Sequence, residues 1–282
     1  MMFAFSLRRH AFHGTAVFGG ECGLIMNPPD FREEAKKQKG GGGMPIRSEY
    51  TLTDARIPKA LRLLIIGDVH NEPYDALLPL LSGADALLVP GDIANRYNGR
   101  WEIGIRFLEQ AARRLPVFFS PGNHETRLAE NYETILRQAA EAGARVLCCE
   151  RVDFEGIVIG GCSFSDPEEP VCLPRSLTDG ERYQIMLCHK PEWAARLLDT
   201  PIDLWVSGHA HGGQIAVFGH GVLAPGQGLF PKYTRGLYHG KLLVTAGVGN
   251  PCRMPRWGNP REAALLTLLP GGHVPEVSRE TV

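Results

Sequence analysis

The stretch LRLLIIGDVH, residues 61–70, contains the pattern on which the fold of this chain depends. A short run of branched apolar residues is followed at once by a glycine, a carboxylate and a histidine. Such a run is typical of a strand that is buried on both faces of a sheet. We therefore expect Asp68 and His70 to lie just beyond the carboxyl end of a buried strand.

Four further apolar runs end in loops that carry Asp, Asn or His. They are ADALLVPGD (84–92), PVFFSPGNHE (116–125), RYQIMLCHKPE (182–192) and IDLWVSGHAHGGQ (202–214). The chain between and after them predicts helices over 73–83, 100–115, 127–143 and 193–200, a hairpin over 144–161, and final strands over 241–247 and 263–270. In the helix over 100–115, residues Trp101, Ile105, Leu108 and Ala112 are expected on one apolar face. Helices early and hairpins later favour a mixed-sheet α/β domain.

Composition limits the classes of function. The chain has 282 residues, 44% of them hydrophobic and 22% charged, with a formal net charge of -1. No basic excess supports a nucleic-acid surface, so no nucleic-acid partner is expected. Seven cysteines without regular spacing favour a reducing cytoplasm over a disulfide framework. No apolar run reaches the roughly 20 residues of a transmembrane segment. Nothing in the sequence indicates an oligomeric state.

The first 48 residues differ in character from the rest. Arginines and histidines interrupt their apolar part, and a charged stretch closed by GGGG (40–43) follows. We interpret residues 1–48 as a disordered extension or a misassigned start that ends in a flexible linker. The globular domain is expected over residues 49–282.

The polar residues after the five runs suggest one shared site, because ligands of open α/β sheets bind beyond the carboxyl ends of the strands. The set consists of Asp68, His70, Asp92, Asn123, His124, His189, His209 and His211. The alternative is a series of unrelated polar turns, which would have to collect half of the ten histidines by chance. Carboxylates, amides and imidazoles together suit Mn, Fe or Zn. One carboxylate can bridge two ions about 3.5–4 Å apart, and such a pair holds a hydroxide.

The ordered motifs D-x-H, G-D, G-N-H-E, H and G-H-x-H resemble the calcineurin-like metallophosphoesterase superfamily over residues 61–269. The GHAHGGQ segment, with the chain that follows it, resembles a bacterial phosphodiesterase-like branch. The resemblance implies a four-layer αββα sandwich of two mixed β-sheets flanked by helices. It also implies hydrolysis of a small-molecule phosphoester, with phosphodiesters preferred, by a metal-bridging hydroxide. The implied cofactor is two divalent metal ions per chain, most simply manganese, with iron or zinc as alternatives.

The resemblance also assigns roles to the candidate residues. The first ion would be held by Asp68, His70 and His211. The second would be held by Asn123, His189 and His209. Asp92 would bridge the two ions, and His124 would be the general acid that protonates the leaving oxygen.

Two neighbouring residues are candidate substrate contacts. Asn95 stands where many relatives have an aspartate that supports the catalytic histidine. An amide cannot stabilise an imidazolium by charge, so His124 would be a weaker acid that favours good leaving groups. Asn95 could equally be a turn residue. Arg96 matches a phosphate-binding arginine of phosphoprotein phosphatases, and arginine suits bidentate phosphate contact; the alternative is a solvated surface arginine.

Two other functions are compatible with the same fold. One is a non-catalytic metal-binding scaffold, and the other is a phosphomonoesterase or protein phosphatase. Every ligand position and the acid position are filled in this sequence. Because function depends on the residues of a site rather than on the fold, the complete set favours an enzyme.

Overall fold

A computed structural model describes residues 44–162, 180–217, 220–224, 227–250 and 254–271. Residues 1–43 of the extension expected over 1–48 lie outside these ranges. The first strand, β1 (Ile46–Asp54), begins slightly ahead of the domain boundary expected after residue 48.

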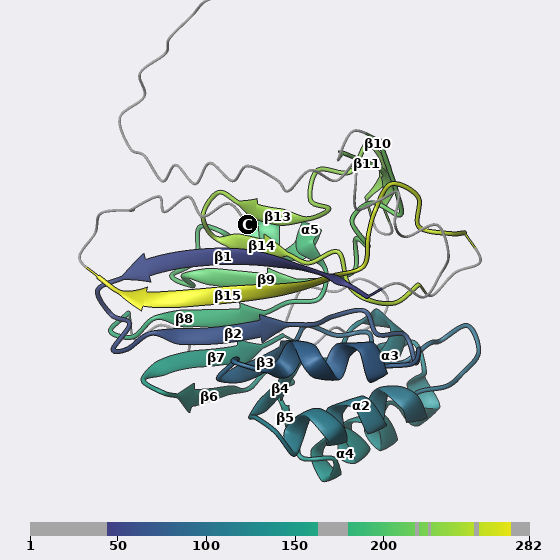
Figure 1. The fold of residues 1–282 in the computed structure, drawn as a ribbon, viewed down its shortest axis with the longest axis horizontal. Coiled ribbons are helices and arrows are strands. Elements are labelled where there is room, and N and C mark those ends of the chain that lie inside the picture. Colours follow the sequence, from purple (N-terminus) through teal and green to yellow (C-terminus); the bar gives the residue numbers. More distant parts are fainter. Residues whose placement is uncertain (1–43, 163–179, 218–219, 225–226, 251–253, 272–282) are drawn as a thin grey trace, which may run out of the picture.

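Two six-stranded mixed sheets form the body of the protein (Figure 1). The first sheet has the order β1-β15-β2-β3-β4-β5. Its other strands are β15 (Glu262–Pro270), β2 (Leu61–Ile65), β3 (Ala86–Val89), β4 (Val117–Phe119) and β5 (Arg145–Val146). Strands β2, β3, β4 and β5 run parallel, and β15 pairs with β2 in the antiparallel sense.

The second sheet has the order β13-β14-β9-β8-β7-β6. Its strands are β13 (Gly236–Tyr238), β14 (Leu242–Val244), β9 (Leu204–Ser207), β8 (Gln184–Leu187), β7 (Ile157–Gly161) and β6 (Arg151–Phe154). Strands β14, β9, β8 and β7 are parallel, with an antiparallel strand at each edge. A small antiparallel sheet is formed by β10 (Ile215–Val217), β11 (His220–Ala224) and β12 (Gly228–Leu229).

The protein has four layers, and an apolar cluster lies between each neighbouring pair of layers. Leu63 and Leu88 of the first sheet pack against Ile185 and Val206 of the second, so the central cluster lies between the sheets. The outer face of the first sheet packs against α2 (Glu102–Ala112), α4 (Tyr132–Glu141) and the 3₁₀ helix η1 (Asp75–Leu81). The outer face of the second sheet packs against α5 (Pro191–Ala194) and η3 (Ala195–Leu197). The arrangement confirms the predicted αββα sandwich.

Several local predictions were confirmed only in part. The helix expected over 73–83 is the shorter 3₁₀ helix η1, which contains Pro79, and proline lacks the N–H that an α-helix needs. In α2 the fully buried residues are Gly104, Phe107, Leu108 and Ala111. Leu108 of the predicted face is therefore buried, and Ile105 and Ala112 are half-buried against the same cluster. The helix over 127–143 is shorter, because η2 (Ala129–Asn131) precedes α4. The hairpin over 144–161 is limited to β6 and β7, since β5 joins the other sheet.

The parallel strands place all five polar loops at one edge of the sandwich. Strands β2, β3 and β4 share a direction in one sheet, and β8 and β9 share a direction in the other. Each of these strands is followed by one of the loops identified in the sequence. The carboxyl ends of two packed sheets therefore supply the side chains of a single site.

The packing between the sheets predicts the cost of a core truncation. Leu63 is fully buried in the central cluster, so Leu63→Ala should lower the free energy of unfolding by about 3 kcal/mol. Thr51→Ala on exposed β1 is the control and should change it by less than about 0.5 kcal/mol. Urea denaturation of both variants measures the difference, and equal small effects would contradict the assigned core.

Candidate metal centre

The structure brings all eight candidate residues together, and every one of them is buried. Seven of the side chains, all but that of Asn123, form three groups in which one possible ligand atom of each residue lies within 4.8 Å of the others. The groups are Asp68–His70–His211, His70–Asp92–His124 and Asp92–His189–His209. Because His70 and Asp92 each belong to two groups, the three form one continuous cluster.

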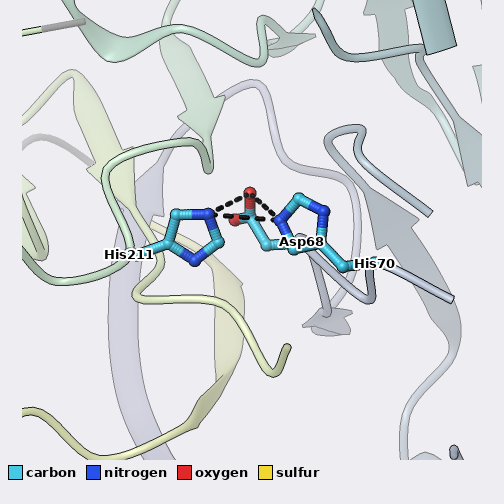
Figure 2. Close-up of side chains that lie close together, drawn as sticks. All are labelled: Asp68, His70 and His211. Atoms are coloured by element: carbon cyan, nitrogen blue, oxygen red, sulfur yellow. Dashed lines mark hydrogen bonds and ion pairs between the residues drawn. The ribbon is translucent and has the colours of Figure 1, made fainter. Parts of the chain in front are cut away.

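Asp68, His70 and His211 come from two loops and converge on one point (Figure 2). Oδ1 of Asp68 lies 3.7 Å from Nε2 of His70 and 3.6 Å from Nε2 of His211. The two Nε2 atoms are 3.2 Å apart. Two nitrogens bound to one ion at about 2.1 Å would be about 3.0–3.4 Å apart in tetrahedral or octahedral geometry. The spacing therefore fits two ligands of a common ion.

The second set of donors lies on the other side of Asp92. Oδ2 of Asp92 is 3.1 Å from Nε2 of His189, and the His189 and His209 rings meet edge to face at 5.0 Å. Within the described residues, no hydrogen-bond partner reaches the buried Oδ1 of Asn123. An unsatisfied buried amide oxygen is costly, and a bound cation would satisfy it. The donor set therefore fits a second ion.

The partner of Nδ1 distinguishes His70 and His189, which are candidate metal ligands, from His124, the candidate acid. Nδ1 of His70 lies 3.2 Å from the carbonyl of Ala94, and Nδ1 of His189 lies 2.7 Å from the carbonyl of Pro90. A carbonyl accepts only, so Nδ1 carries a proton in both rings and Nε2 is the nitrogen that faces the centre. His124 has the opposite arrangement.

At His124, the backbone N–H of Arg96 donates to Nδ1 at 3.2 Å. An amide N–H donates only, so neutral His124 carries its proton on Nε2. This Nε2 lies 3.9 Å from Oδ2 of Asp92 and faces the same centre. His124 is thus arranged as a hydrogen-bond or proton donor rather than as a metal ligand.

Burial and mutual charge set the protonation states of the cluster. Burial disfavours ionised Asp68, but the neighbouring histidines, His211 first, hold the pKa of this carboxyl below its usual range. The pKa of Asp92 is likewise held well below its usual range, chiefly by His189. Burial also opposes the charged form of His189, yet Asp92 raises the pKa of His189 to about 10. Burial lowers the pKa of His211 to about 3 and that of His124 to about 4. The centre combines anionic carboxylates with mostly neutral imidazoles, the states in which these groups bind cations.

Five of the eight side chains stand on a left-handed backbone. The φ angles are +56° at Asp68, +52° at His70, +58° at Asp92, +67° at His209 and +49° at His211. Outside glycine this conformation costs about 1–2 kcal/mol per residue. Such strain persists where the surrounding structure enforces it, and it is concentrated at functional sites.

Hydrogen bonds between two loops hold part of this strained backbone. The N–H groups of Asp68 and His70 donate to the carbonyls of Gly91 and Asp92, at 3.1 and 2.9 Å. The loops after β2 and β3 therefore fix each other, and with them the spacing between Asp68 and Asp92.

Glu125 is a buried residue of the centre to which the sequence analysis gave no role. Its carboxylate accepts hydrogen bonds from the N–H groups of Asp92, Ala94 and Gly122, at 2.9, 2.8 and 2.7 Å. Burial, together with the Asp92 charge, raises the pKa of Glu125 to about 7. The sequence does contain a signal for this role, because Glu125 is the last residue of the GNHE motif. An acid three residues into a helix commonly binds free backbone N–H groups.

Asn95 and Arg96 lie on the turn next to His124. Oδ1 of Asn95 accepts the N–H of Tyr97 at 3.0 Å, which favours the alternative that Asn95 is a turn residue. The guanidinium of Arg96 lies over the Tyr97 ring at 4.8 Å and donates to its hydroxyl at 3.0 Å. Among the described residues, the buried Nε of Arg96 has no hydrogen-bond partner. Arg96 therefore has an N–H group beside the centre that can still donate a hydrogen bond.

Comparisons with known proteins agree with this geometry. A profile described as calcineurin-like phosphoesterase matches residues 61–213. An uncharacterized metallophosphoesterase of Aquifex aeolicus is 26% identical over 254 residues, covering 80% of this chain and 92% of that protein. An uncharacterized metallophosphoesterase of Helicobacter pylori is 28% identical over 234 residues, and the match covers 76% of this chain and 61% of that protein.

One solved structure, the protein TT1561 of Thermus thermophilus, is similar with a TM-score of 0.41 and 16% identity. The match covers 53% of this chain and 82% of that one. Within the described residues, no helix combines the length and apolar character needed to cross a membrane.

The three hydrogen bonds of Glu125 predict the effect of removing one acceptor oxygen. Glu125→Gln should lower metal affinity about 10–100-fold, because an amide NH₂ would face a backbone N–H and move the Asp92 loop. Calorimetric titration with Mn²⁺ measures this. Glu109→Gln, at an exposed helical ion pair with Arg113, is the matched control and should bind metal as the wild type does. Unchanged affinity in Glu125→Gln would contradict the assigned role.

Proposed function

This chain belongs to the calcineurin-like phosphoesterase family, and we propose that it hydrolyses phosphodiesters with two divalent ions at the carboxyl ends of five strands. One feature supports the proposal above the others. The buried carboxylate of Asp92 lies between two sets of donors, with Oδ2 3.1 Å from Nε2 of His189 and 3.9 Å from Nε2 of His70. A carboxylate in that position suits a bridge between two ions.

The donors divide between the two proposed ions. Asp68, His70 and His211 would hold the first, and Asn123, His189 and His209 would hold the second, with Asp92 shared. Two such ions, when bound, lower the pKa of water and offset negative charge on phosphoryl oxygens. Nε2 is the nitrogen of His70 and of His189 that an ion would bind, because backbone carbonyls hold the Nδ1 protons. The pKa of His189 is about 10, so a bound cation would displace a proton from its Nε2.

His124 is the proposed proton donor to the leaving oxygen. Its Nε2 proton faces the centre, and its ring lies 4.4 Å from that of His70. To give up its Nε2 proton and return to a neutral ring, His124 must first be protonated at Nδ1, which replaces the hydrogen bond from the Arg96 N–H. That N–H favours the neutral ring, whereas a carboxylate at Nδ1 would stabilise the imidazolium. We therefore expect substrates with good leaving groups to react best.

Tyr97 and Arg96 are the proposed substrate contacts beside His124. The Tyr97 ring is 63% exposed and meets the His124 ring edge to face at 5.5 Å. It offers an apolar surface for the second ester group of a diester. The guanidinium of Arg96 can donate to a phosphoryl oxygen. These two side chains support diesters over monoesters.

The identity of the ions and the location of the protein are also proposals. Mixed oxygen and imidazole donors support manganese, with iron or zinc as alternatives. Within the part of the chain that the structure describes, Cys148 and Cys188 are free thiols, which supports the cytoplasm. The substrate class is a small-molecule phosphoester.

The proposed reaction predicts metal-dependent turnover of a model diester. Metal-stripped protein titrated with Mn²⁺ should hydrolyse bis-p-nitrophenyl phosphate faster than p-nitrophenyl phosphate, with activity reaching its maximum near two ions per chain. Release of p-nitrophenol measures both reactions. A preference for the monoester would support the phosphatase alternative. No turnover with Mn, Fe, Zn, Co, Ni or Mg would support the scaffold alternative.

The proton-donor role predicts a dependence on the leaving group. His124→Asn should slow hydrolysis of a dialkyl diester, which has to expel an alkoxide, about 10²-fold or more. It should slow expulsion of p-nitrophenolate much less, because that anion leaves without a proton. Mn²⁺ stoichiometry should stay at the wild-type value. Loss of one ion would instead identify His124 as a ligand, and equal slowing of both substrates would contradict proton donation.

A further inference from the structure

Arg256 is a half-buried residue with a buried Nε atom, and it lies outside the region that the family profile matches, residues 61–213. Its guanidinium donates to four backbone carbonyls. Nη1 reaches the carbonyls of Gly247 at 2.8 Å and Gly249 at 3.2 Å. Nη2 reaches those of Ala246 at 2.5 Å and His211 at 3.2 Å. One side chain thus links the loop after β14 to the loop that carries His211.

The loop after β14 is in turn fixed to Asp68. The N–H of Gly249 donates to the carbonyl of Asp68 at 2.7 Å, and the N–H of Val248 donates to the carbonyl of Gly67 at 3.2 Å. A Cβ added to Gly247 would lie 2.6 Å from Cβ of Asp68. The two loops have no space between them, so a displacement of the loop over 246–249 moves Asp68.

At the other end, two donors hold the peptide that follows His211. Nη2 of Arg256 and Nδ2 of Asn259 both donate to the His211 carbonyl. The backbone of His211 is left-handed at +49°, and that of Gly212 is at +61°. Because this conformation costs free energy, the peptide needs external hydrogen bonds to remain there. Arg256 and Asn259 supply them.

A guanidinium is the side chain best suited to this position. It presents five N–H donors in one plane, whereas a lysine ammonium has three on one atom. Burial lowers the pKa of Arg256 to about 10, which leaves it charged at neutral pH. The charge lies close enough to Asp68 to interact with its carboxylate.

We propose that Arg256 is a positioning residue for the first ion, because it holds the loops of Asp68 and His211 at the spacing at which both side chains face one point. This inference rests on the proposed function, since it assumes that Asp68, His70 and His211 bind an ion. It assigns no contact between Arg256 and that ion. None of the four carbonyls that Arg256 binds belongs to Asn123, His189 or His209, the residues of the second donor set.

Stepwise Mn²⁺ binding by metal-stripped full-length protein tests the proposal. Calorimetry of Arg256→Lys and Arg256→Met should show one ion bound with wild-type affinity and the other bound about 10–100-fold more weakly. Arg256→Lys keeps the charge, so it separates positioning from charge balance. Arg56→Met is the matched control. Arg56 is also partly buried and binds Asp54 and Asp203, and Asp203 precedes β9 at the end opposite the centre. It should lower the thermal midpoint yet bind two ions as the wild type does.

The outcomes separate this inference from the proposed function. Two ions bound normally by both Arg256 variants would overturn the inference and leave the proposed function in place. The inference would also be overturned if the Arg256 variants bound both ions more weakly by the same factor and had a lowered thermal midpoint. The loss of affinity would then reflect general destabilisation of the protein. Wild-type protein that binds fewer than two ions would overturn the proposed function and the inference together.

Discussion

The buried carboxylate of Asp92 is the group on which the rest of the centre depends. One oxygen accepts the N–H of His124 at 2.8 Å, and the other faces His70, His124 and His189. Its own N–H is held by Glu125. A buried anion without compensation would cost several kcal/mol, and here its surroundings consist of imidazoles and N–H donors. This arrangement requires strands from both sheets to end at the same edge of the sandwich. The packing of the two sheets therefore determines the surroundings of the Asp92 carboxylate.

Backbone strain and glycine contacts show how closely the loops are packed around that group. Five of the candidate residues are left-handed, and the stabilisation that offsets this cost comes from the cores on either side of the sheets. A Cβ on Gly122 would meet Oδ1 of Asp92, and one on Gly208 would meet Oδ2 of Asp68. Glycine is required at these positions because the carboxylates occupy the space. A centre enforced in this way is preorganised, so binding a cation needs little rearrangement.

The strand ends and their polar residues were predictable because buried parallel strands read as continuous apolar runs. The buried face of α2 was predicted only in part. A Cβ on Gly104 would lie 2.5 Å from the carbonyl of Ile93, so α2 packs closely on the Asp92 loop and buries Gly104 as well as the predicted Leu108. The contacts of Glu125 with the N–H groups of Asp92 and Ala94, and of Arg256 with the carbonyl of His211, join residues far apart in sequence. No pattern of residue types identifies the partners in such bonds, so tertiary structure was needed to find them.

The electron paramagnetic resonance spectrum of the protein loaded with two equivalents of Mn²⁺ tests whether Asp92 is shared by two ions. If Asp92 bridges the ions at about 3.5–4 Å, the two spins must be magnetically coupled. We expect the broad spectrum of an exchange-coupled pair in place of the six-line signal of isolated Mn²⁺. Two bound ions that retain the isolated six-line signal would contradict a shared centre at Asp92.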